Sequence, residues 1–456
     1  MLSQLPWMKG LTGLDTELRQ AEEEGRALTQ ELRQEAEALR KRPVTEREAQ
    51  AAAERIYEAI QALPLREGYS YLEPSDLEGI QAARPAQPPL EKRTLSPEEL
   101  YDRIYGGWLG RCGGCLLGQP VEGWHRERIL GLLRESGNLP VKGYISSDLP
   151  AGVRERYQVT DEGGAYGAKL KGWINNVAYM PEDDDTNYTV LALKLLEDKG
   201  PDFTPEDVAE CWLTCLPLLH TCTAERAAYI NLANLLPPPL SAQTSNPYRE
   251  WIGAQIRGDL FGYVRPGDPE GAAALAWRDA SISHVKNGIY GEIFAAAMIA
   301  AAFVEPDPAG VVRAGLAQVP ERSRLAESIR QVLSWREDGV SRQDAIDRVH
   351  QVWDEKQPHC WCHTISNAML VAIGLLYGNG EYAASVEVGL ISGFDTDCNA
   401  ATIGSIVGVM WGAKGLPEEW TAPLHDTLKS GVDGFGVVKI SDLARRTAAL
   451  ASCPAR

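Results

Sequence analysis

The strongest constraint on the fold is an apolar segment near the C-terminus that begins with two carboxylates. Asp395 and Asp397 precede a run in which Gly404, Gly408 and Gly412 recur at every fourth position. Helical geometry places these glycines on one face, where they let a second backbone approach closely. We therefore expect a buried helix. Carboxylates at the start of such a helix need a cation or several hydrogen-bond donors, because an unpaired buried charge is very costly.

The main body of the chain is predicted to be mostly α-helical. Ser96, with Pro97 at the first helical position and Glu99 three residues after the serine, is typical of a helix start. Alternating strand patterns are scarce, and no repeat of fixed period is present. The stretch 140–182 differs, because Gly, Tyr, Val and Ser are frequent there. We expect short β segments or a long loop in this insertion.

The N-terminal region has a different composition from the body. Residues 14–60 are rich in Glu, Arg, Gln and Ala and carry leucines at roughly helical spacing, with Thr45 as a predicted helix start. A proline-rich connector follows at 83–90. We therefore divide the chain into an N-terminal helical extension with its connector, 1–92, and a main domain, 93–456. Charged helices of this kind usually present a solvated face; the alternatives are that the extension packs on the body, covers a cleft or forms a dimer contact.

Charge and composition exclude several classes of protein. The chain has 63 acidic and 45 basic residues, a net charge of −18, which argues against a nucleic-acid-binding face. No segment approaches the roughly 20 apolar residues that a bilayer span needs, and no signal-peptide pattern is seen. Nine cysteines, an odd number, favour reduced thiols over a disulfide framework. We expect a cytoplasmic protein that binds neither nucleic acid nor membranes.

A second acidic cluster lies about 210 residues before the first. Asp183, Asp184 and Asp185 precede another apolar helical run. One interpretation is a solvated helix start, where the helix dipole stabilises each exposed carboxylate by about 0.3–1 kcal/mol. The other is that this cluster meets Asp395 and Asp397 in space and holds one or two divalent ions. Oxygen ligands select Mg²⁺, Mn²⁺ or Ca²⁺, and open positions on such ions suit hydrolysis.

Three motifs in a fixed order connect these acids to a known family. The first runs from Gly110 to Glu122, the second is Asp183–Thr186, and the third spans 393–398, while His284 follows one Ala-rich helix and precedes another. Together they resemble the ADP-ribosylglycohydrolase family, which includes dinitrogenase-reductase-activating glycohydrolase. The resemblance covers about residues 97–450. It implies an all-α fold, a compact bundle of many helices, with two Mg²⁺ (or Mn²⁺) ions and hydrolysis at the anomeric carbon of a ribose.

The resemblance also implies a set of metal ligands. These are Asp183, Asp184, Asp185, Asp395 and Asp397. Asp183 and Cys398 stand where the family has a ligating threonine, and Cys115 replaces an aspartate of the first motif. A thiol is a soft ligand for a hard ion, so these departures bear on ion occupancy and on the natural substrate.

Catalytic and substrate-binding residues are assigned in the same way. Glu122 and Asp184 are the candidates for proton transfer, and Asp397 is also expected to act in catalysis. His284 is assigned to a substrate contact. The turn at Asn287 and Gly288 offers backbone N–H groups to a diphosphate. Phe394 is likewise expected to line the substrate site.

The leading hypothesis is a metal-dependent hydrolase of an N- or O-glycosidic bond. Its partner is a ribosyl or ADP-ribosyl small molecule or an ADP-ribosylated protein. The alternative is a non-catalytic binder of ADP-ribose-like ligands, in which Cys115 and Cys398 mark lost chemistry. A helical scaffold with incidental acidic caps is a weaker third hypothesis, and a zinc site built from the cysteines is less favoured than buried thiols. The aglycone, the anomer cleaved and the oligomeric state are left open.

Overall fold

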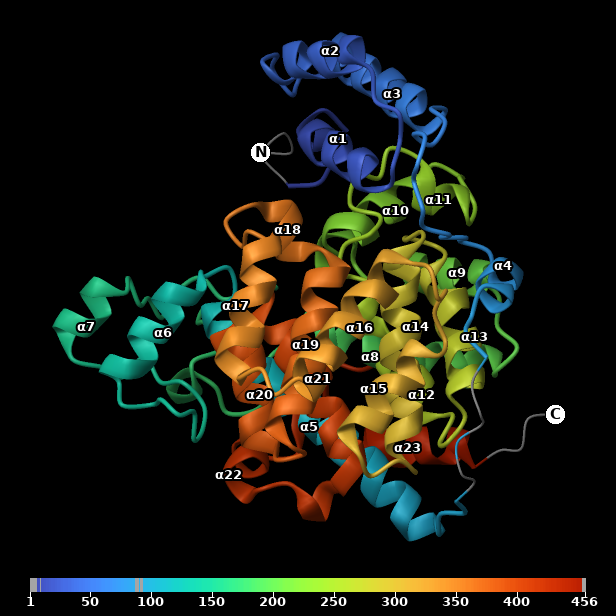
Figure 1. The fold of residues 1–456 in the computed structure, drawn as a ribbon. Helices are drawn as coiled ribbons and strands as arrows, with labels where there is room; N and C mark the ends of the chain where they lie inside the picture. The colour runs from blue at the N-terminus through green and yellow to red at the C-terminus, as the bar shows by residue number, and fades with distance from the viewer. Residues whose placement is uncertain (1–5, 9, 87–89, 91–92, 453–456) are drawn as a thin grey trace.

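The computed structural model describes residues 6–8, 10–86, 90 and 93–452, so part of the predicted connector lies outside the described residues. Within them the chain is almost entirely helical (Figure 1). The helices of the first half are α1 (Leu14–Glu23), α2 (Gln30–Arg40), α3 (Arg47–Gln61), α4 (Leu77–Ala82), α5 (Pro97–Gly118), α6 (Arg126–Glu135), α7 (Ala151–Arg156), α8 (Asp184–Lys199), α9 (Pro205–Cys215), α10 (Thr223–Ala233) and α11 (Leu240–Gln243). Those of the second half are α12 (Asp259–Tyr263), α13 (Pro269–Ala280), α14 (Asn287–Ala302), α15 (Pro308–Leu316), α16 (Arg324–Glu337), α17 (Arg342–Val352), α18 (Pro358–Cys362), α19 (Thr364–Gly378), α20 (Tyr382–Ile391), α21 (Thr396–Trp411), α22 (Glu418–Thr421) and α23 (Ile440–Ala451). The predicted all-α fold is confirmed.

Four helices form the centre of the body because they are apolar on all sides. Helices α14, α19, α20 and α21 bury nearly every side chain, as expected for helices without a polar face. The N-terminus of α5 has the predicted cap, since the Ser96 hydroxyl accepts a hydrogen bond from the Glu99 amide at 3.1 Å. Helix α5 then runs through the body beside α21.

Helices α1, α2 and α3 pack together above the body (Figure 1). They share a small core of their own, formed by Leu11, Leu14, Ala21, Ala36, Leu39, Ala49, Ala53, Ile56, Tyr57 and Ile60. The predicted N-cap at Thr45 is wrong by one residue, because the N-cap of α3 is Glu46. Helix α3 begins at Arg47 after Glu46, and no side chain caps it. The extension packs on the body through polar contacts described below.

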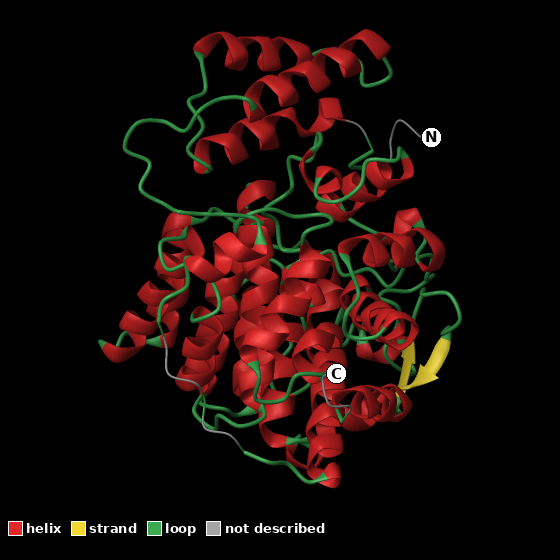
Figure 2. Ribbon diagram, turned by 90° about the vertical axis from the view of Figure 1, so that its right-hand side faces the viewer, coloured by secondary structure: helices red, strands yellow, loops and turns green. Residues whose placement is uncertain are grey.

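The insertion at 140–182 contains no strand among its residues, all of which are described. It forms α7, a 3₁₀ turn at Ile174–Asn176 and long loops, with two isolated bridges: an antiparallel one between Glu162 and Leu170, and a parallel one between Met180 and Leu428. The two strands of the described chain lie elsewhere. They are β1 (Thr427–Lys429) and β2 (Val437–Lys439), an antiparallel pair near the C-terminus (Figure 2). Of the two predictions for the insertion, the long loop is therefore the better one.

No helix in the described part of the chain is long and apolar enough to cross a bilayer. The eight described cysteines are all free thiols, as predicted. Cys453 lies outside the described residues.

Candidate active site

Glycines bring the end of α5 against the start of α21. A Cβ atom on Gly110 would overlap the carbonyl oxygen of Gly404, and one on Gly106 would overlap that of Gly408. The two helices run in opposite directions, so Gly118 at the end of α5 touches the backbone of Thr396 at the start of α21. This close approach confirms the prediction from the glycine spacing. It also places the residues that follow Gly118 next to the acidic turn that precedes α21.

A fully buried arginine fixes the start of α8 in the same place. The Arg111 guanidinium lies 3.0 Å from an Asp185 carboxylate oxygen and 2.9 Å from one of Asp259. It also donates to the backbone carbonyl of Ile256 at 2.6 Å. Arg111 was not singled out in the sequence, although it lies within the first motif. Its partners are distant in the chain and carry no pattern that links them to it.

The two aspartate clusters meet, as predicted. Ligand atoms of Cys115, Asp183, Asp185 and Asp397 all lie within 4.8 Å of one another, and those of Asp395, Asp397 and Cys398 form a second such group. We call Asp183, Asp184, Asp185, Asp395 and Asp397 the acid cluster. Asp184 is in neither group; it is half-buried at the first position of α8.

Three carboxylate oxygens of the cluster are buried without a hydrogen-bond partner. They belong to Asp185, Asp395 and Asp397, whose exposed fractions are 0%, 5% and 2%. Burial, despite the nearby Arg111, raises the pKa of Asp185 to about 8. Burial likewise raises the pKa of Asp395 to about 6. Carboxylates held this way gain from a cation that replaces the missing donors, so the residues fit a hard divalent ion.

The two thiols beside the cluster are poor ligands for such an ion. Burial, and then the charge of Asp183, raises the pKa of Cys115 well above that of a free thiol. Burial and the charge of Asp185 do the same for Cys398. A thiol must lose its proton to bind a metal. Both cysteines therefore act as neutral neighbours of the carboxylates.

Two amide side chains position the carboxylates. Gln119 donates to an Asp183 oxygen at 2.6 Å. The side-chain oxygen of Asn367 accepts hydrogen bonds from the Asn399 side chain at 2.8 Å and from the Asp395 amide at 3.4 Å. The Asn367 side-chain amide also donates to the carbonyl of His363, one helical turn earlier, at 3.0 Å.

Glu122 lines a cavity next to the acid cluster. The cavity measures about 220 Å³, and its other walls come from Gln119, Pro120, Pro181, Glu182 and the loop residues 163–165, 168 and 170–172. The Glu122 side chain is exposed there. Surrounding protein atoms nevertheless desolvate its carboxyl group. This desolvation, followed by the charges of Asp395, Asp183 and Asp184, raises the pKa of Glu122 well above its ordinary value.

The chain was compared with protein families, with solved structures and with curated proteins. The sequence profile of the ADP-ribosylglycohydrolase family matches residues 96–454. The chain belongs to the ADP-ribosylglycohydrolase family. Among solved structures it is similar to one titled "ADP-ribosylglycohydrolase-related protein complex", at 18% identity and a TM-score of 0.43, over 77% of this chain and 98% of the other. No curated protein matches the sequence significantly. As a member of this family, the chain is related to enzymes that hydrolyse glycosidic bonds of ADP-ribosyl substrates.

The first of the predicted substrate-binding residues, His284, lines a different cavity from Glu122. His284 is buried, shares a hydrogen bond of 2.8 Å with the Ser283 hydroxyl and has an unpartnered Nε2. It lines a separate cavity of about 490 Å³ with Trp277 and Ile289. None of the hydrogen bonds or ion pairs seen among the described residues links His284 to the acid cluster. Its assignment to the substrate site stays a prediction.

The other three residues predicted to bind substrate contact other parts of the protein. They are Asn287, Gly288 and Phe394. The Asn287 amide donates to Glu73 and Glu250 at 2.8 and 2.9 Å. Gly288 lies so close to the Arg249 carbonyl that a Cβ atom would overlap it. Phe394 has φ of +56° and packs in the interior against His350, with ring centroids 4.9 Å apart. The Asn287 and Phe394 side chains are thus engaged within the protein, and the three substrate contacts stay predictions.

A third group of potential ligands is better explained without a metal. Glu23 of α1 lies 3.0 Å from His359 Nε2 and 3.5 Å from His363 Nε2. The Nδ1 atom of His359 accepts from the Trp251 indole, and that of His363 from the Ile365 amide, both at 3.1 Å. Each neutral ring must then carry its proton on Nε2. The His359 Nε2 proton is donated to Glu23, whereas His363 Nε2 lies 3.5 Å from the same carboxylate without a hydrogen bond to it. Ring nitrogens that carry protons cannot bind a metal ion, so the group is better explained as two histidines beside a carboxylate.

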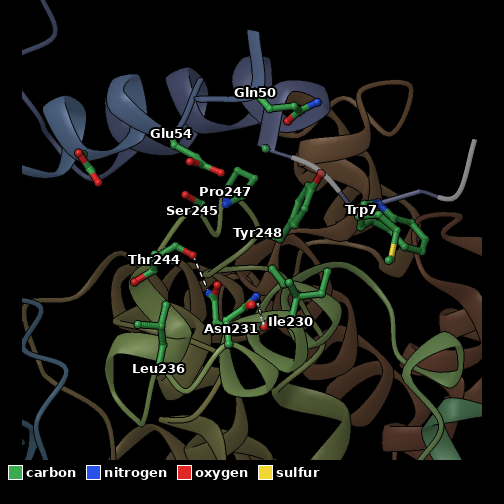
Figure 3. Close-up of a pocket in the computed structure, with 15 residues that line it drawn as sticks. Trp7, Gln50, Glu54, Ile230, Asn231, Leu236, Thr244, Ser245, Pro247 and Tyr248 are labelled. Carbon is green, nitrogen blue, oxygen red and sulfur yellow. Dashed lines mark hydrogen bonds between the residues drawn. The ribbon is translucent and has the colours of Figure 1, made fainter. Parts of the chain in front are cut away.

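Another cavity separates the N-terminal helices from α10 and α11 (Figure 3). It measures about 400 Å³ and has Glu54 above, Trp7 and Tyr248 at the side, and Asn231 below. The Asn231 amide is already used, since it donates to the carbonyls of Ser241 and Thr244. The cavity includes no residue of the acid cluster.

Proposed function

We propose that the protein is a metal-dependent hydrolase of an N- or O-glycosidic bond at the anomeric carbon of a ribosyl or ADP-ribosyl group. The observation that carries the proposal is the set of three buried, unpartnered carboxylate oxygens where α8 and α21 begin. Family membership supplies the class of reaction. The acid cluster supplies a reason for metal dependence, because it holds more negative charge than Arg111 neutralises.

The acid cluster would hold one or two Mg²⁺ or Mn²⁺ ions. Carboxylate oxygens are the ligands that these ions prefer, and the neutral thiols of Cys115 and Cys398 do not compete for them. When bound, such an ion supplies positive charge that orients ribose hydroxyls and makes a nearby water more acidic.

The residues of the chain would do the remaining work. Cleavage breaks the bond from C1 to the aglycone and forms a bond from C1 to a water oxygen, through an oxocarbenium-like transition state. Buried carboxylates such as Asp397 favour the positive charge on the sugar. Glu122 or Asp184 would take one proton from the attacking water. The aglycone leaves with the electron pair of the broken bond and gains one proton in exchange, so that the water is divided between C1 and the aglycone. The cavity beside Glu122 gives a substrate access to this carboxyl group.

The test removes the central carboxylates. The Asp395→Ala/Asp397→Ala double variant should lose both Mn²⁺ binding, measured by calorimetry, and Mn²⁺-dependent release of ribose product from ribosyl and ADP-ribosyl substrates. The matched control is Glu418→Ala/Glu419→Ala, which removes two exposed acids from the first turn of α22 and should change neither. Circular dichroism establishes that both variants fold. Full metal-free activity of the first variant would overturn the proposal.

One observation favours a second candidate, a non-catalytic binder of ADP-ribose-like ligands. Two protonated thiols lie beside the cluster: Cys398 stands where the family has a ligating threonine, and Cys115 replaces an aspartate of the first motif. Titration calorimetry followed by chromatography separates the candidates. A binder returns the ligand unchanged, whereas a hydrolase returns the sugar and the aglycone as separate products.

A further inference from the structure

Buried ion pairs anchor the N-terminal extension to the body. Arg249 lies 2.5 Å from a carboxylate oxygen of Glu17 in α1, and 2.7 Å from one of Glu24, the residue after that helix. Lys286 lies 2.9 Å from the other carboxylate oxygen of Glu24. Glu17, Glu24 and Arg249 are all buried. Because separating such partners leaves uncompensated charges in the interior, α1 has a fixed position on the body.

The last residue of α1 also contacts the junction between α18 and α19, residues 359–364. The His359 Nε2 proton is donated to Glu23 at 3.0 Å. One turn earlier in α1, the Arg19 guanidinium donates to the Cys360 sulfur at 3.5 Å. The His359 side chain is buried, so this contact is enclosed between the extension and the body. Helix α1 therefore lies directly against the junction and restricts its movement.

A segment of the body holds the same junction through backbone hydrogen bonds. The Thr364 amide donates to the carbonyl of Glu250 at 3.0 Å. The Ile252 amide donates to the carbonyl of Cys362 at 2.8 Å. This segment begins directly after Arg249, the arginine that pairs with the extension. The extension thus constrains the junction by two routes, one through a side chain of α1 and one through Arg249.

Asn367, in the first turn of α19, connects the junction to the acid cluster. Its side-chain nitrogen donates to the carbonyls of Trp361 and His363 at 2.9 and 3.0 Å. Its oxygen accepts from the Asn399 side chain at 2.8 Å and from the Asp395 amide at 3.4 Å. Two carbonyls on one side and two donors on the other permit only one orientation of this amide. A shift of the junction must therefore move Asn367 relative to Asp395.

We propose that the N-terminal extension is a working part of the proposed metal site, and that Glu23 is a positioning residue for Asp395. The inference rests on the proposed hydrolase function and adds a means of regulating it. While α1 is docked, Glu23 holds the junction through His359, and Asn367 holds the turn that carries Asp395. Release of α1 frees the junction, lets Asp395 move relative to the other carboxylates and lowers the affinity of the acid cluster for a divalent ion.

The experiment uses two variants, a matched control for each, and one combination. Glu23→Ala removes the contact of α1 with His359, and its control Glu22→Ala removes an exposed acid of the same helix that pairs with Arg33 inside the extension. Asn367→Leu removes the amide that reaches the acid cluster. Its control, Asn231→Leu, removes a buried amide that donates to two carbonyls outside both the junction and the acid cluster. The combination is Glu23→Ala/Asn367→Leu.

Calorimetry measures the Mn²⁺ affinity of each protein, and hydrogen exchange of residues 393–399 is followed without metal. Asn367→Leu should weaken Mn²⁺ binding by about 10- to 100-fold, as the loss of a group that orients a ligand does. Glu23→Ala acts at a greater distance and should weaken it by about 2- to 30-fold. Both should accelerate exchange at 393–399, and the two controls should change neither quantity. The combination should bind Mn²⁺ as Asn367→Leu alone does, because Glu23 acts through Asn367.

Equal Mn²⁺ affinities of Glu23→Ala and Glu22→Ala, or wild-type affinity in Asn367→Leu, overturn the inference and leave the proposed function standing. So does a combination whose loss of affinity is the product of the two single losses. Should circular dichroism show that Asn367→Leu does not fold, the comparison of Glu23→Ala with Glu22→Ala in both measurements decides the inference alone. A wild-type protein that binds no Mn²⁺ counts against the proposed function itself.

Discussion

Replacing Gly110 by alanine tests whether the contact between α5 and α21 positions the acid cluster. The added methyl would overlap the Gly404 carbonyl, which belongs to the backbone of the facing helix and cannot rotate away. The helices are long, Pro97–Gly118 and Thr396–Trp411, and buried around this point. The substitution must therefore push them apart.

Two opposing terms set the size of the effect. Alanine is a better helix former than glycine by about 0.5–1 kcal/mol. Overpacking a well-filled core costs about 1–3 kcal/mol, and occasionally more. The overlap is with backbone, so we place its cost at the upper end and expect a net destabilisation of about 2–2.5 kcal/mol. Because Asp395 and Asp397 stand at the start of α21, the same displacement should weaken Mn²⁺ binding.

Urea denaturation and calorimetry with Mn²⁺ measure the two effects. The matched control is Gly152→Ala in α7, where the added methyl would have no neighbour within 4 Å and φ is not positive. This variant should be neutral or up to about 1 kcal/mol more stable, with unchanged Mn²⁺ affinity. If Gly110→Ala proves as stable as Gly152→Ala and binds Mn²⁺ like the wild type, the glycine contact does not position the cluster.

Two further predictions concern buried ion pairs. Arg111→Met leaves Asp185 and Asp259 buried without their counter-charge, so urea denaturation should show a loss of about 3–5 kcal/mol; a loss under 1 kcal/mol would contradict this. Burial, despite Arg249, raises the pKa of Glu17 from 4.5 to about 7. The folded state then keeps a proton that the unfolded chain has released, so stability falls as pH rises from about 5 to 7, by at most about 3 kcal/mol. Glu17→Gln should remove that fall, and equal pH profiles for the two proteins would refute the shift.

Local patterns predicted the parts of the structure that depend on neighbouring residues. The glycine spacing from Gly404 to Gly412 predicted the buried helix and its close contact. The cap at Ser96 predicted where α5 begins. The convergence of Asp183 and Asp185 with Asp397 was also predicted, because buried carboxylates at two helix starts require a shared partner. Each inference needed only helical periodicity and the cost of burying charge.

Contacts between distant segments left no such pattern. Nothing in the first motif distinguishes Arg111 from its neighbours, because its partners Asp185 and Asp259 are far away in the sequence. Glu23 looked like a solvated acid on a charged helix, yet His359 and His363 hold it in a largely buried site. The strands at 427–429 and 437–439 are three residues each, too short for a visible alternation. These contacts and strands depend on tertiary packing between distant segments, which the periodicity of a sequence does not indicate.

The thiols near the acid cluster bear on which ion it selects. If Cys115 or Cys398 bound as a thiolate, the site would favour a soft metal such as zinc. Burial, and then the charges of the surrounding carboxylates, raise the pKa of both thiols and so disfavour the thiolate form. A protonated Cys398 instead lies beside Asp395 and Asp397 as a neutral neighbour. The cysteines therefore reduce the number of strong ligands while preserving the preference for a hard ion. Fewer ligands predict weaker binding of that ion, without a change in its kind.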